Sequence, residues 1–387
     1  MIFKDISRAT TIMLHKNLRK NISYLDWALW RISSKKENIK PSKIKKILVV
    51  LINQEKGNAG GDFATLGVLN CFKKNFPKKK IFLLSDKKTL NNLGSIKGIE
   101  IILSDNFNLK ELRKKNIDVV IFMNPGKFSP KNFNFIPIRV GFTARGIKGY
   151  FRRLNLKGYT LKIFNRLDEH MIDLRFKMFE GLGFKFKHKK LFLDVSEAEK
   201  KKANSFIKEN KLKKFIIIHP GGKYVAESYK QGKWPPHLWN IERYSEVANY
   251  FVNKGFQIII TGSKDESSIA EEIRKNNPKI INSCGKLALK EIGFLLTKTS
   301  CLVSTDTSIV HIAYQVDVPI VELMGPSIPE IAGAWPLNSP NHIILIDKGP
   351  CYKSMRKLPY KDNFNCLKNI KTEEVISAVN SLISKPR

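Results

Sequence analysis

The most chemically suggestive stretch of the sequence is a polar loop that follows the apolar run 301–304. Asp306 comes where this run ends, and Thr307 and Ser308 open a helical pattern that carries His311 in its first turns. The free N–H groups at the start of a helix can hold a phosphate or diphosphate. Asp306 could equally be the N-cap of the same helix. The loop therefore predicts either an anion site or an ordinary helix start.

Three further loops occupy the equivalent place after other apolar runs. Gly221 and Gly222 let a ligand approach the backbone closely, and Lys233 precedes a helix start, where the helix dipole would also favour a phosphate. Alone, Lys233 would be interpreted as a surface lysine near a turn. Glu266 could bind ribose hydroxyls or form the acidic first turn of a helix, and Gly325 allows another close approach. Because doubly wound sheets bind ligands outside the carboxyl ends of their strands, these loops together predict one nucleotide-diphosphate site.

A glycine-rich loop in the first half of the chain carries one more candidate, Asp62. The loop 57–62 follows the continuous apolar run 46–52, which is typical of a buried parallel strand, and precedes a helix-like stretch from Phe63. On the sequence alone, Asp62 is best interpreted as the N-cap of that helix. Its position also allows its carboxylate to project from the first half of the chain into a cleft.

Apolar runs that alternate with helical patterns position all of these loops. They predict an α/β fold of two doubly wound, Rossmann-like domains that face a cleft. A capping box at Ser196 and Glu199 starts a helix that links the two domains. The expected divisions are a basic amphipathic extension at 1–43, a first domain at 44–195, a nucleotide-binding domain at 212–370 and a C-terminal helix at 371–387, with Thr372 as its N-cap. Strands are expected at 46–52, 81–84, 99–103, 119–123, 215–218, 257–261, 301–304 and 320–323.

The balance of charge is the main global feature. The formal net charge of +35 predicts attraction to a polyanion: nucleic acid, an anionic membrane surface or an acidic substrate. AT-rich coding would also enrich lysine. No stretch approaches the roughly 20 apolar residues of a membrane-spanning helix, and the first residues do not resemble a cleaved signal peptide. The five cysteines form no CxxC pair, which argues against a zinc or disulfide framework and favours a reducing cytosol.

Two regions concentrate basic and aromatic residues. Between Leu14 and Ile32, apolar residues recur at spacings of three and four, which predicts an amphipathic helix that could lie in a membrane interface or dock on the protein's own surface. The segment 137–190 is expected to be rich in loops. Its basic residues include Arg139, Arg145, Lys148, Arg152 and Arg153.

Taken together, the motifs resemble glycosyltransferase family 9, the bacterial ADP-heptose:lipopolysaccharide heptosyltransferases and their relatives, over roughly residues 44–385. In the first half, Gly61-Asp62 and the basic loop from Pro137 to Gly146 are similar to elements of this family. Thr307-Ser308 departs from the commoner Ser-Gly or Thr-Gly after the aspartate. The motifs of the second half that carry the resemblance are His219-Pro220-Gly221, Lys233-Trp234-Pro235, Thr261-Gly262, Asp306-Thr307-Ser308-x-x-His311 and Gly325-Pro326-Ser327.

The resemblance implies a GT-B fold and an inverting transfer that uses neither a metal nor a cofactor. It implies that Asp62 acts as the general base, that Lys233 and the N-terminus at Thr307-Ser308 meet the charge on the leaving diphosphate, and that Asp306 and Glu266 bind the donor's sugar and ribose. The implied reaction moves a sugar, heptose from ADP-heptose, to the lipopolysaccharide inner core. The basic residues at 139–153 would then bind this anionic acceptor and, with the N-terminal helix, hold a cytoplasmic enzyme to the inner face of the membrane.

Other functions are compatible with the same residues. A glycosyltransferase with another nucleotide-sugar donor and acceptor would use the same loops, and a nucleotide-sugar epimerase or hydrolase on this fold would need no acceptor. Nucleic-acid binding is prompted only by the net charge, because the sequence contains no RRM, KH or helix-turn-helix signature.

Overall fold

The structure is a computed structural model that describes residues 39–52, 59–124, 127–142, 158–163, 169–232, 234–349, 351–352 and 366–385. The helix expected between Leu14 and Ile32 lies outside the described residues. So do five of the candidate site residues, namely Lys233, Arg145, Lys148, Arg152 and Arg153.

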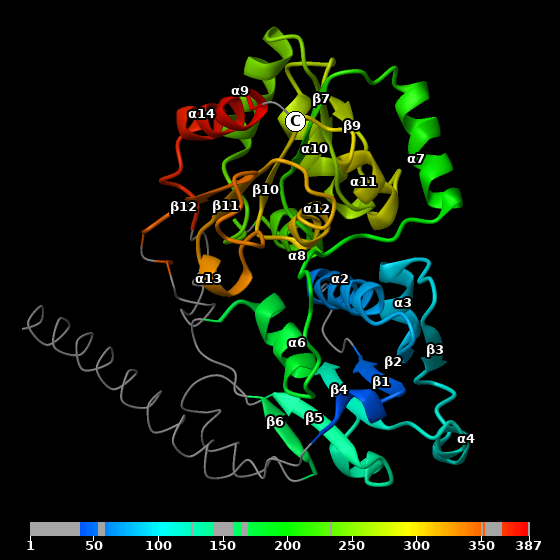
Figure 1. Cartoon of the computed structure of the whole chain (residues 1–387). Coiled ribbons are helices and arrows are strands. Elements are labelled where there is room, and N and C mark those ends of the chain that lie inside the picture. The colour runs from blue at the N-terminus through cyan, green and yellow to red at the C-terminus, as the bar shows by residue number, and fades with distance from the viewer. Residues whose placement is uncertain are drawn as a thin grey trace, which may run out of the picture.

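A six-stranded parallel sheet forms the first half of the described molecule (Figure 1). Its central strand β1 (Lys46–Leu51) is a run of aliphatic residues that is buried along nearly its whole length, as expected for a strand covered on both faces. In spatial order the strands are β3 (Glu100–Leu103), β2 (Lys80–Ser85), β1, β4 (Val119–Asn124), β5 (Ile138–Phe142) and β6 (Leu161–Ile163).

The second sheet repeats this topology. Its first strand β7 (Phe215–His219) is central between β10 and β8, just as β1 is central between β4 and β2. In spatial order the strands are β12 (His342–Ile346), β11 (Ile320–Met324), β10 (Cys301–Thr305), β7, β8 (Gln257–Ile260) and β9 (Ile281–Asn282).

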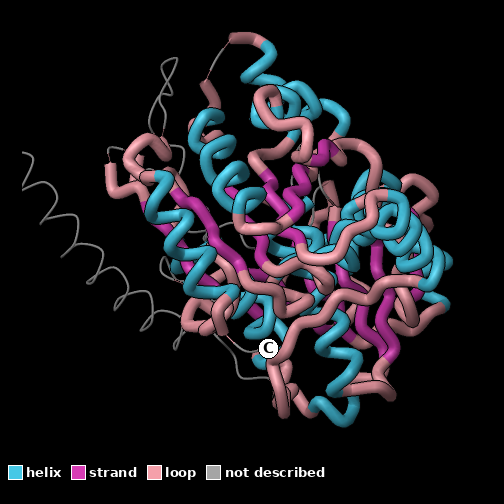
Figure 2. Tube along the Cα trace, turned by 90° about the horizontal axis from the view of Figure 1, so that it is seen from above, coloured by secondary structure: helices cyan, strands magenta, loops and turns pink. Residues whose placement is uncertain are grey.

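Helices cover the faces of both sheets (Figure 2). The α-helices described are α2 (Ala59–Asn75), α3 (Lys87–Leu93), α4 (Leu109–Lys114), α6 (Met171–Glu180), α7 (Glu197–Glu209), α8 (Lys223–Lys230), α9 (Ile241–Asn253), α10 (Ser267–Arg274), α11 (Leu289–Leu296), α12 (Ser308–Ala313), α13 (Pro329–Ala332) and α14 (Thr372–Ile383). Short 3₁₀ helices are η1 (Pro41–Lys43), η2 (Pro130–Phe133) and η3 (Lys264–Glu266).

The predicted doubly wound architecture is confirmed, and all eight expected strands are present with ends that differ by at most a few residues. Four strands were not predicted: β5, β6, β9 and β12. The segment 137–190, expected to be rich in loops, contributes β5 and β6 to the sheet. These strands are short, and β9 and β12 are only partly buried. They therefore carry no long apolar run by which the sequence could have revealed them. Lys371, not Thr372, is the N-cap of α14.

The two halves pack directly on each other through α2 and α12. Phe63 and Leu66 of α2 belong to the same buried apolar cluster as Ile309 and Ile312 of α12. Gln315 Nε2 donates a hydrogen bond across the interface to the carbonyl oxygen of Phe63 at 3.0 Å. It also donates one to the carbonyl oxygen of His311, in the preceding helix α12. The hydrophobic core is therefore continuous between the two sheets at the position where the candidate site residues lie.

One expectation about the cysteines is wrong. Cys351 and Cys366 form a disulfide, although their separation of 15 residues gives no recognisable motif, while Cys71, Cys284 and Cys301 are free thiols. Within the described part of the chain, no three or more His, Cys, Asp or Glu side chains are grouped to hold a metal ion. No helix among the described residues is long and apolar enough to cross a membrane.

Candidate active site

Asp62 lies within the first turn of α2 and not before it. The helix begins at Ala59, so Gly60 and Gly61 are helical and the interpretation of Asp62 as an N-cap is wrong. Glycine is unfavourable inside a helix by roughly 1 kcal/mol relative to alanine, which is why the sequence suggested a later start. Asp62 is 2% exposed and lines a cavity of about 220 Å³ at the carboxyl ends of β1 and β4.

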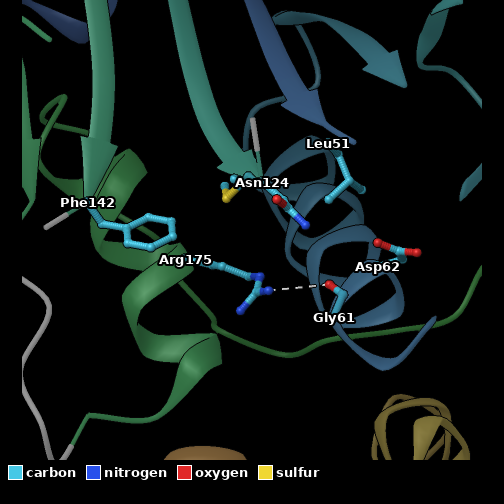
Figure 3. Close-up of a pocket in the computed structure, with 7 residues that line it drawn as sticks. Leu51, Gly61, Asp62, Asn124, Phe142 and Arg175 are labelled. Carbon is cyan, nitrogen blue, oxygen red and sulfur yellow. Dashed lines mark hydrogen bonds between the residues drawn. The ribbon is translucent and has the colours of Figure 1, made fainter. Parts of the chain in front are cut away.

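Arg175 of α6 also lines this cavity, and no sequence motif pointed to it. Its Nε donates to Thr65 Oγ1 at 2.9 Å, its Nη1 to the carbonyl of Met171 at 2.8 Å and its Nη2 to the carbonyl of Gly61 at 3.4 Å. Figure 3 shows the guanidinium reaching from α6 toward the first turn of α2. These bonds hold a positive charge beside the cavity that Asp62 and Asn124 also line.

His311 connects the two domains. It is buried, and its Nδ1 lies 3.0 Å from the hydroxyl of Tyr314. A Cβ placed on Gly60 would lie 2.5 Å from Cδ2 of His311, so only glycine permits this approach of α2 to α12. Burial lowers the pKa of His311 to about 4, although the Asp306 carboxylate opposes this, so the imidazole is neutral at pH 7. The structure therefore brings His311 into contact with Gly60, which is two positions before Asp62 in α2.

Asp306, Thr307 and Ser308 are half-buried at the carboxyl end of β10 and the start of α12. The hydroxyls of Thr307 and Ser304 lie 3.2 Å apart, and no side chain caps the helix. Asp306 is therefore not a side-chain N-cap, because Thr307 occupies that position. The helix itself has only six residues.

Glu322 is a second acid near Asp306 that the sequence did not single out. It lies in the middle of β11, opposite Ser304 of β10, and is fully buried. Its Oε2 accepts a hydrogen bond from the Ala334 N–H at 2.7 Å, and its Oε1 has no partner among the described residues. Burial, together with the Asp306 carboxylate, raises the pKa of Glu322 well above its ordinary value.

The glycines predicted to admit a ligand differ from one another. No described atom lies within 4 Å of a Cβ placed on Gly222, whereas a Cβ on Gly221 would lie 2.7 Å from Val225 and one on Gly325 would meet the carbonyl oxygen of Cys366. At Gly325 the close approach is thus made by the protein's own backbone. Among the three glycines, Gly222 is the one beside free volume.

His219 holds this loop in place and is not charged. Its Nδ1 lies 3.0 Å from Thr261 Oγ1 of the neighbouring strand end, and burial lowers its pKa to about 4. The Thr305 hydroxyl donates to the carbonyl of Pro220 at 3.4 Å. The ends of three strands, β7, β8 and β10, are therefore tied together where the loops that follow them begin.

Glu266 is the last residue of η3 and is 2% exposed. Its Oε2 accepts a hydrogen bond from the Ser263 N–H at 2.7 Å in a capping box, and its Oε1 has no partner among the described residues. Burial raises its pKa to about 7, while the bonds from Ser263 act in the opposite direction. Glu266 is thus an acid at a helix start, as one interpretation predicted. Its Oε1 also leaves an acceptor for a hydroxyl, which the ribose-binding interpretation requires.

Arg139, the one described member of the basic acceptor set, lies in β5. Its Nη1 donates to the carbonyl of Ile136 at 2.5 Å, and its Nε donates to the carbonyl of Gly158. These bonds anchor the loop before β6 to the sheet. Arg139 does not line the cavity beside Asp62, in contrast to Arg175.

Arg175 and Glu322 were not predicted from the sequence, and neither belongs to a local motif. Arg175 is one of many basic residues and is separated by more than 100 positions from the carbonyl and hydroxyl groups it binds on α2. Glu322 is a single acid in an otherwise apolar strand, Ile320–Met324. A buried acid inside an apolar run is unusual, and this could have been noticed in the sequence.

Two doubly wound domains of the same topology, packed on each other with their polar strand ends close together, define the GT-B class of fold. Two solved structures share this architecture. The glycosyl transferase family 9 protein of Veillonella parvula has a TM-score of 0.68 at 22% identity, and E. coli ADP-heptose lps heptosyltransferase II has a TM-score of 0.63 at 19% identity; each comparison covers 88% of this chain and 98% of the other. At this level of identity they establish the fold alone.

A sequence model of glycosyltransferase family 9 (heptosyltransferase) matches residues 108–363, and the chain belongs to this family. The resemblance found in its motifs is thereby confirmed. The chain is 27% identical over 199 residues to lipopolysaccharide heptosyltransferase 2 of Salmonella typhimurium, a match that covers 50% of this chain and 53% of that protein. It is 23% identical over 348 residues to the lipopolysaccharide core heptosyltransferase OpsX of Haemophilus influenzae, covering 84% and 94%. The chain thus spans about half the length of several of its curated relatives and nearly all of another.

Proposed function

We propose that this protein is an inverting, metal-independent glycosyltransferase that moves a sugar, heptose from ADP-heptose, to the lipopolysaccharide inner core. The observation that carries the proposal is the contact of α2 with α12, which places Asp62 next to the helix that follows Asp306. Membership of the family and the names of its relatives support the choice of donor and acceptor.

In the proposed reaction, Asp62 takes the proton of an acceptor hydroxyl in the cavity it lines. The acceptor oxygen forms a bond to the anomeric carbon of the donor as the bond to the diphosphate breaks on the opposite face, which inverts the configuration. Arg175 holds the first turn of α2 and adds positive charge beside an anionic acceptor. Arg139, Arg145, Lys148, Arg152 and Arg153 remain proposed acceptor residues.

On the donor side, Thr307 and Ser308 supply backbone N–H groups and hydroxyls to the diphosphate, with Lys233 as the proposed cation. Gly222 leaves room for the diphosphate to approach the backbone. The unpartnered oxygen of Glu266 is suited to a ribose hydroxyl, and Asp306 to a hydroxyl of the transferred sugar. We further propose that His311 acts by holding the two domains in contact, since it packs on Gly60.

The test is a transfer assay with the full chain, ADP-heptose and lipopolysaccharide from a heptose-deficient strain, in which ADP release and product mass are both measured. We expect both to require the acceptor and to continue in EDTA. ADP release without acceptor would instead indicate a hydrolase, and a preference for a UDP- or GDP-sugar would refute the choice of donor. Asp306→Ala should abolish the thermal stabilisation by the donor. The control is Asp317→Ala, which removes an aspartate that pairs with Lys190 at 3.7 Å and should leave this stabilisation unchanged.

We also propose peripheral contact between the cytoplasmic enzyme and an anionic membrane surface. The net charge of +35 supports it, because each basic residue near such a surface contributes about 1 kcal/mol. The full chain should sediment with anionic vesicles at low salt, and removal of residues 1–38 should reduce the bound fraction. Equal binding of the two proteins would contradict a role for the extension.

A further inference from the structure

A second, larger cavity lies away from Asp62. It has a volume of about 620 Å³ and is formed by the residues that follow β3 and β4. We call it the Phe107–Phe128 pocket, after the two rings in its wall. We infer that this pocket binds a sugar ring of an extended acceptor, one or more residues away from the hydroxyl that reacts. The inference rests on the proposed function and adds a subsite to it.

The pocket is on the same edge of the same sheet as the cavity of Asp62. The N–H of Ser104, at the end of β3, donates to the carbonyl of Ser85 at 2.8 Å, and the Ser85 hydroxyl donates to the carbonyl of Leu51 at 2.7 Å. Leu51 in turn lines the cavity of Asp62. Adjacent strands are about 4.8 Å apart, so β1 and β3 are separated by about 10 Å. A short run of linked sugar rings can bridge this distance.

Aromatic rings form the apolar wall of the pocket. Phe107 and Phe128 pack edge to face with their centroids 4.9 Å apart, and both remain half-buried. Beneath them Phe133 is fully buried, with its centroid 5.8 Å from that of Phe107. The core thus holds the upper two rings rigidly while part of their surface faces the pocket. Such a wall suits the C–H face of a sugar ring, which is apolar and cannot be hydrogen-bonded.

Amide side chains form the polar part of the wall, and two of them are already oriented. Asn108 Oδ1 accepts a hydrogen bond from the Lys110 N–H at 2.9 Å, and Asn132 Oδ1 accepts one from the Ser129 N–H at 2.9 Å. Since each oxygen is committed, the position of each Nδ2 donor group is fixed as well. Asn106 is exposed at the same rim. Fixed amide donors beside aromatic faces are the groups that a hydroxylated ring requires.

The charge of the pocket distinguishes a neutral sugar from a phosphate. The chain carries a net charge of +35, yet among the described residues the charged side chains that line this pocket are one acid and one base, Asp105 and Lys127. A phosphate or carboxylate would gain little here compared with the rest of the surface, whereas hydroxyl groups can pair with both residues. The pocket therefore fits an uncharged part of the acceptor.

The experiment compares two acceptors, a deacylated lipopolysaccharide inner-core oligosaccharide and a single-sugar fragment of it, with the full chain and variants. Phe128→Leu removes the aromatic face but keeps apolar volume, and Asn106→Ala removes a donor at an exposed position. Each should raise KM for the oligosaccharide by roughly three- to tenfold, with kcat, KM for the donor and the kinetics of the fragment unchanged. Phe135→Leu is the matched control, because Phe135 lies close by, under Arg113, but does not line the pocket.

Saturation-transfer NMR with the same oligosaccharide provides a readout that does not depend on turnover. Contacts from the sugar protons should be present in the wild type and in Phe135→Leu and reduced in Phe128→Leu. If the wild type transfers sugar but KM for the oligosaccharide is unchanged in both pocket variants, the subsite is refuted. If the wild type transfers nothing, the proposed function fails, and the NMR contacts alone then decide whether the pocket binds a sugar.

Discussion

The two sheets have the same strand order but carry different chemistry at their carboxyl edges. At the first edge, Asp62 and Arg175 surround a cavity, which suits proton transfer from a bound hydroxyl. At the second edge, burial raises the pKa of Glu266 to about 7, and within β11 it raises that of Glu322 well above its ordinary value. Burial thus favours the neutral form of these two glutamates, which weakens their repulsion of an anionic ligand. Topology thus decides where each half-site lies, and the residues at the strand ends decide what it does.

The largest expected effect tests whether the first edge performs the chemistry. Asp62→Asn keeps the size of the side chain but removes the base, so kcat should fall by about 10²- to 10⁴-fold. The thermal shift caused by the donor should persist, because the proposed donor site is at the other edge. Asp265→Asn, at an exposed acid, should retain the wild-type rate. Wild-type turnover in Asp62→Asn would show that the chemistry does not depend on this edge.

The next prediction concerns the raised pKa of Glu266 at the second edge. The pKa of Glu266 is about 7 in the folded protein and near 4.5 when unfolded, so the folded state retains a proton that the unfolded state loses between these values. The free energy of unfolding should therefore fall as pH rises from about 4.5 to 7, by about 3 kcal/mol from this residue. Above pH 7 its contribution is constant.

Glu266→Gln should remove this component. The difference between the unfolding free energies of the variant and the wild type, measured by urea titration, should grow across the same pH range and then level off. Asp265→Asn controls for the loss of a nearby acid. Parallel curves for wild type and Glu266→Gln would mean that Glu266 is ionised in the folded protein and that the two edges do not differ in this way.

Sequence patterns predicted the fold well because continuous aliphatic runs such as residues 47–51, which alternate with helical patterns, are typical of strands covered on both faces. The candidate donor loops were visible in the sequence because they are local, with glycine, hydroxyl and acid residues directly after a strand, and their role in binding a donor stays a prediction. Sequence patterns failed where partners are distant in the chain. Arg175 meets Gly61 only after α6 folds onto α2, and the Gly60–His311 contact depends on the packing of two domains. Asp62 was placed at the right edge, but the glycines before it obscured the start of its helix.

The third prediction sharpens the role of the first edge by removing its cation. Arg175→Met deletes the hydrogen bonds that the guanidinium donates to Gly61 and Thr65. Because the donor is charged, each bond is worth about 1.5–3 kcal/mol. We expect kcat/KM for the acceptor to fall by about 10- to 100-fold, with KM for the donor unchanged. Arg175→Lys should recover little, because an ammonium cannot make the same forked set of bonds. Arg113→Met, which removes an arginine stacked on Phe135, is the control. A fall confined to donor binding would assign Arg175 to the other half-site.

The smallest effect concerns the contact between the two edges. Gln315→Leu has a similar volume but loses the 3.0 Å bond to the Phe63 carbonyl, so the free energy of unfolding should fall by about 1 kcal/mol. Because Phe63 follows Asp62, the same change should lower kcat several-fold while donor binding, measured by calorimetry, stays constant. Gln257→Leu removes hydrogen bonds of a glutamine on β8, remote from the interface, and should reduce stability without this effect on kcat. If the two variants lose stability equally and both retain the wild-type kcat, the domain contact stabilises the fold without positioning Asp62, and the two edges act independently.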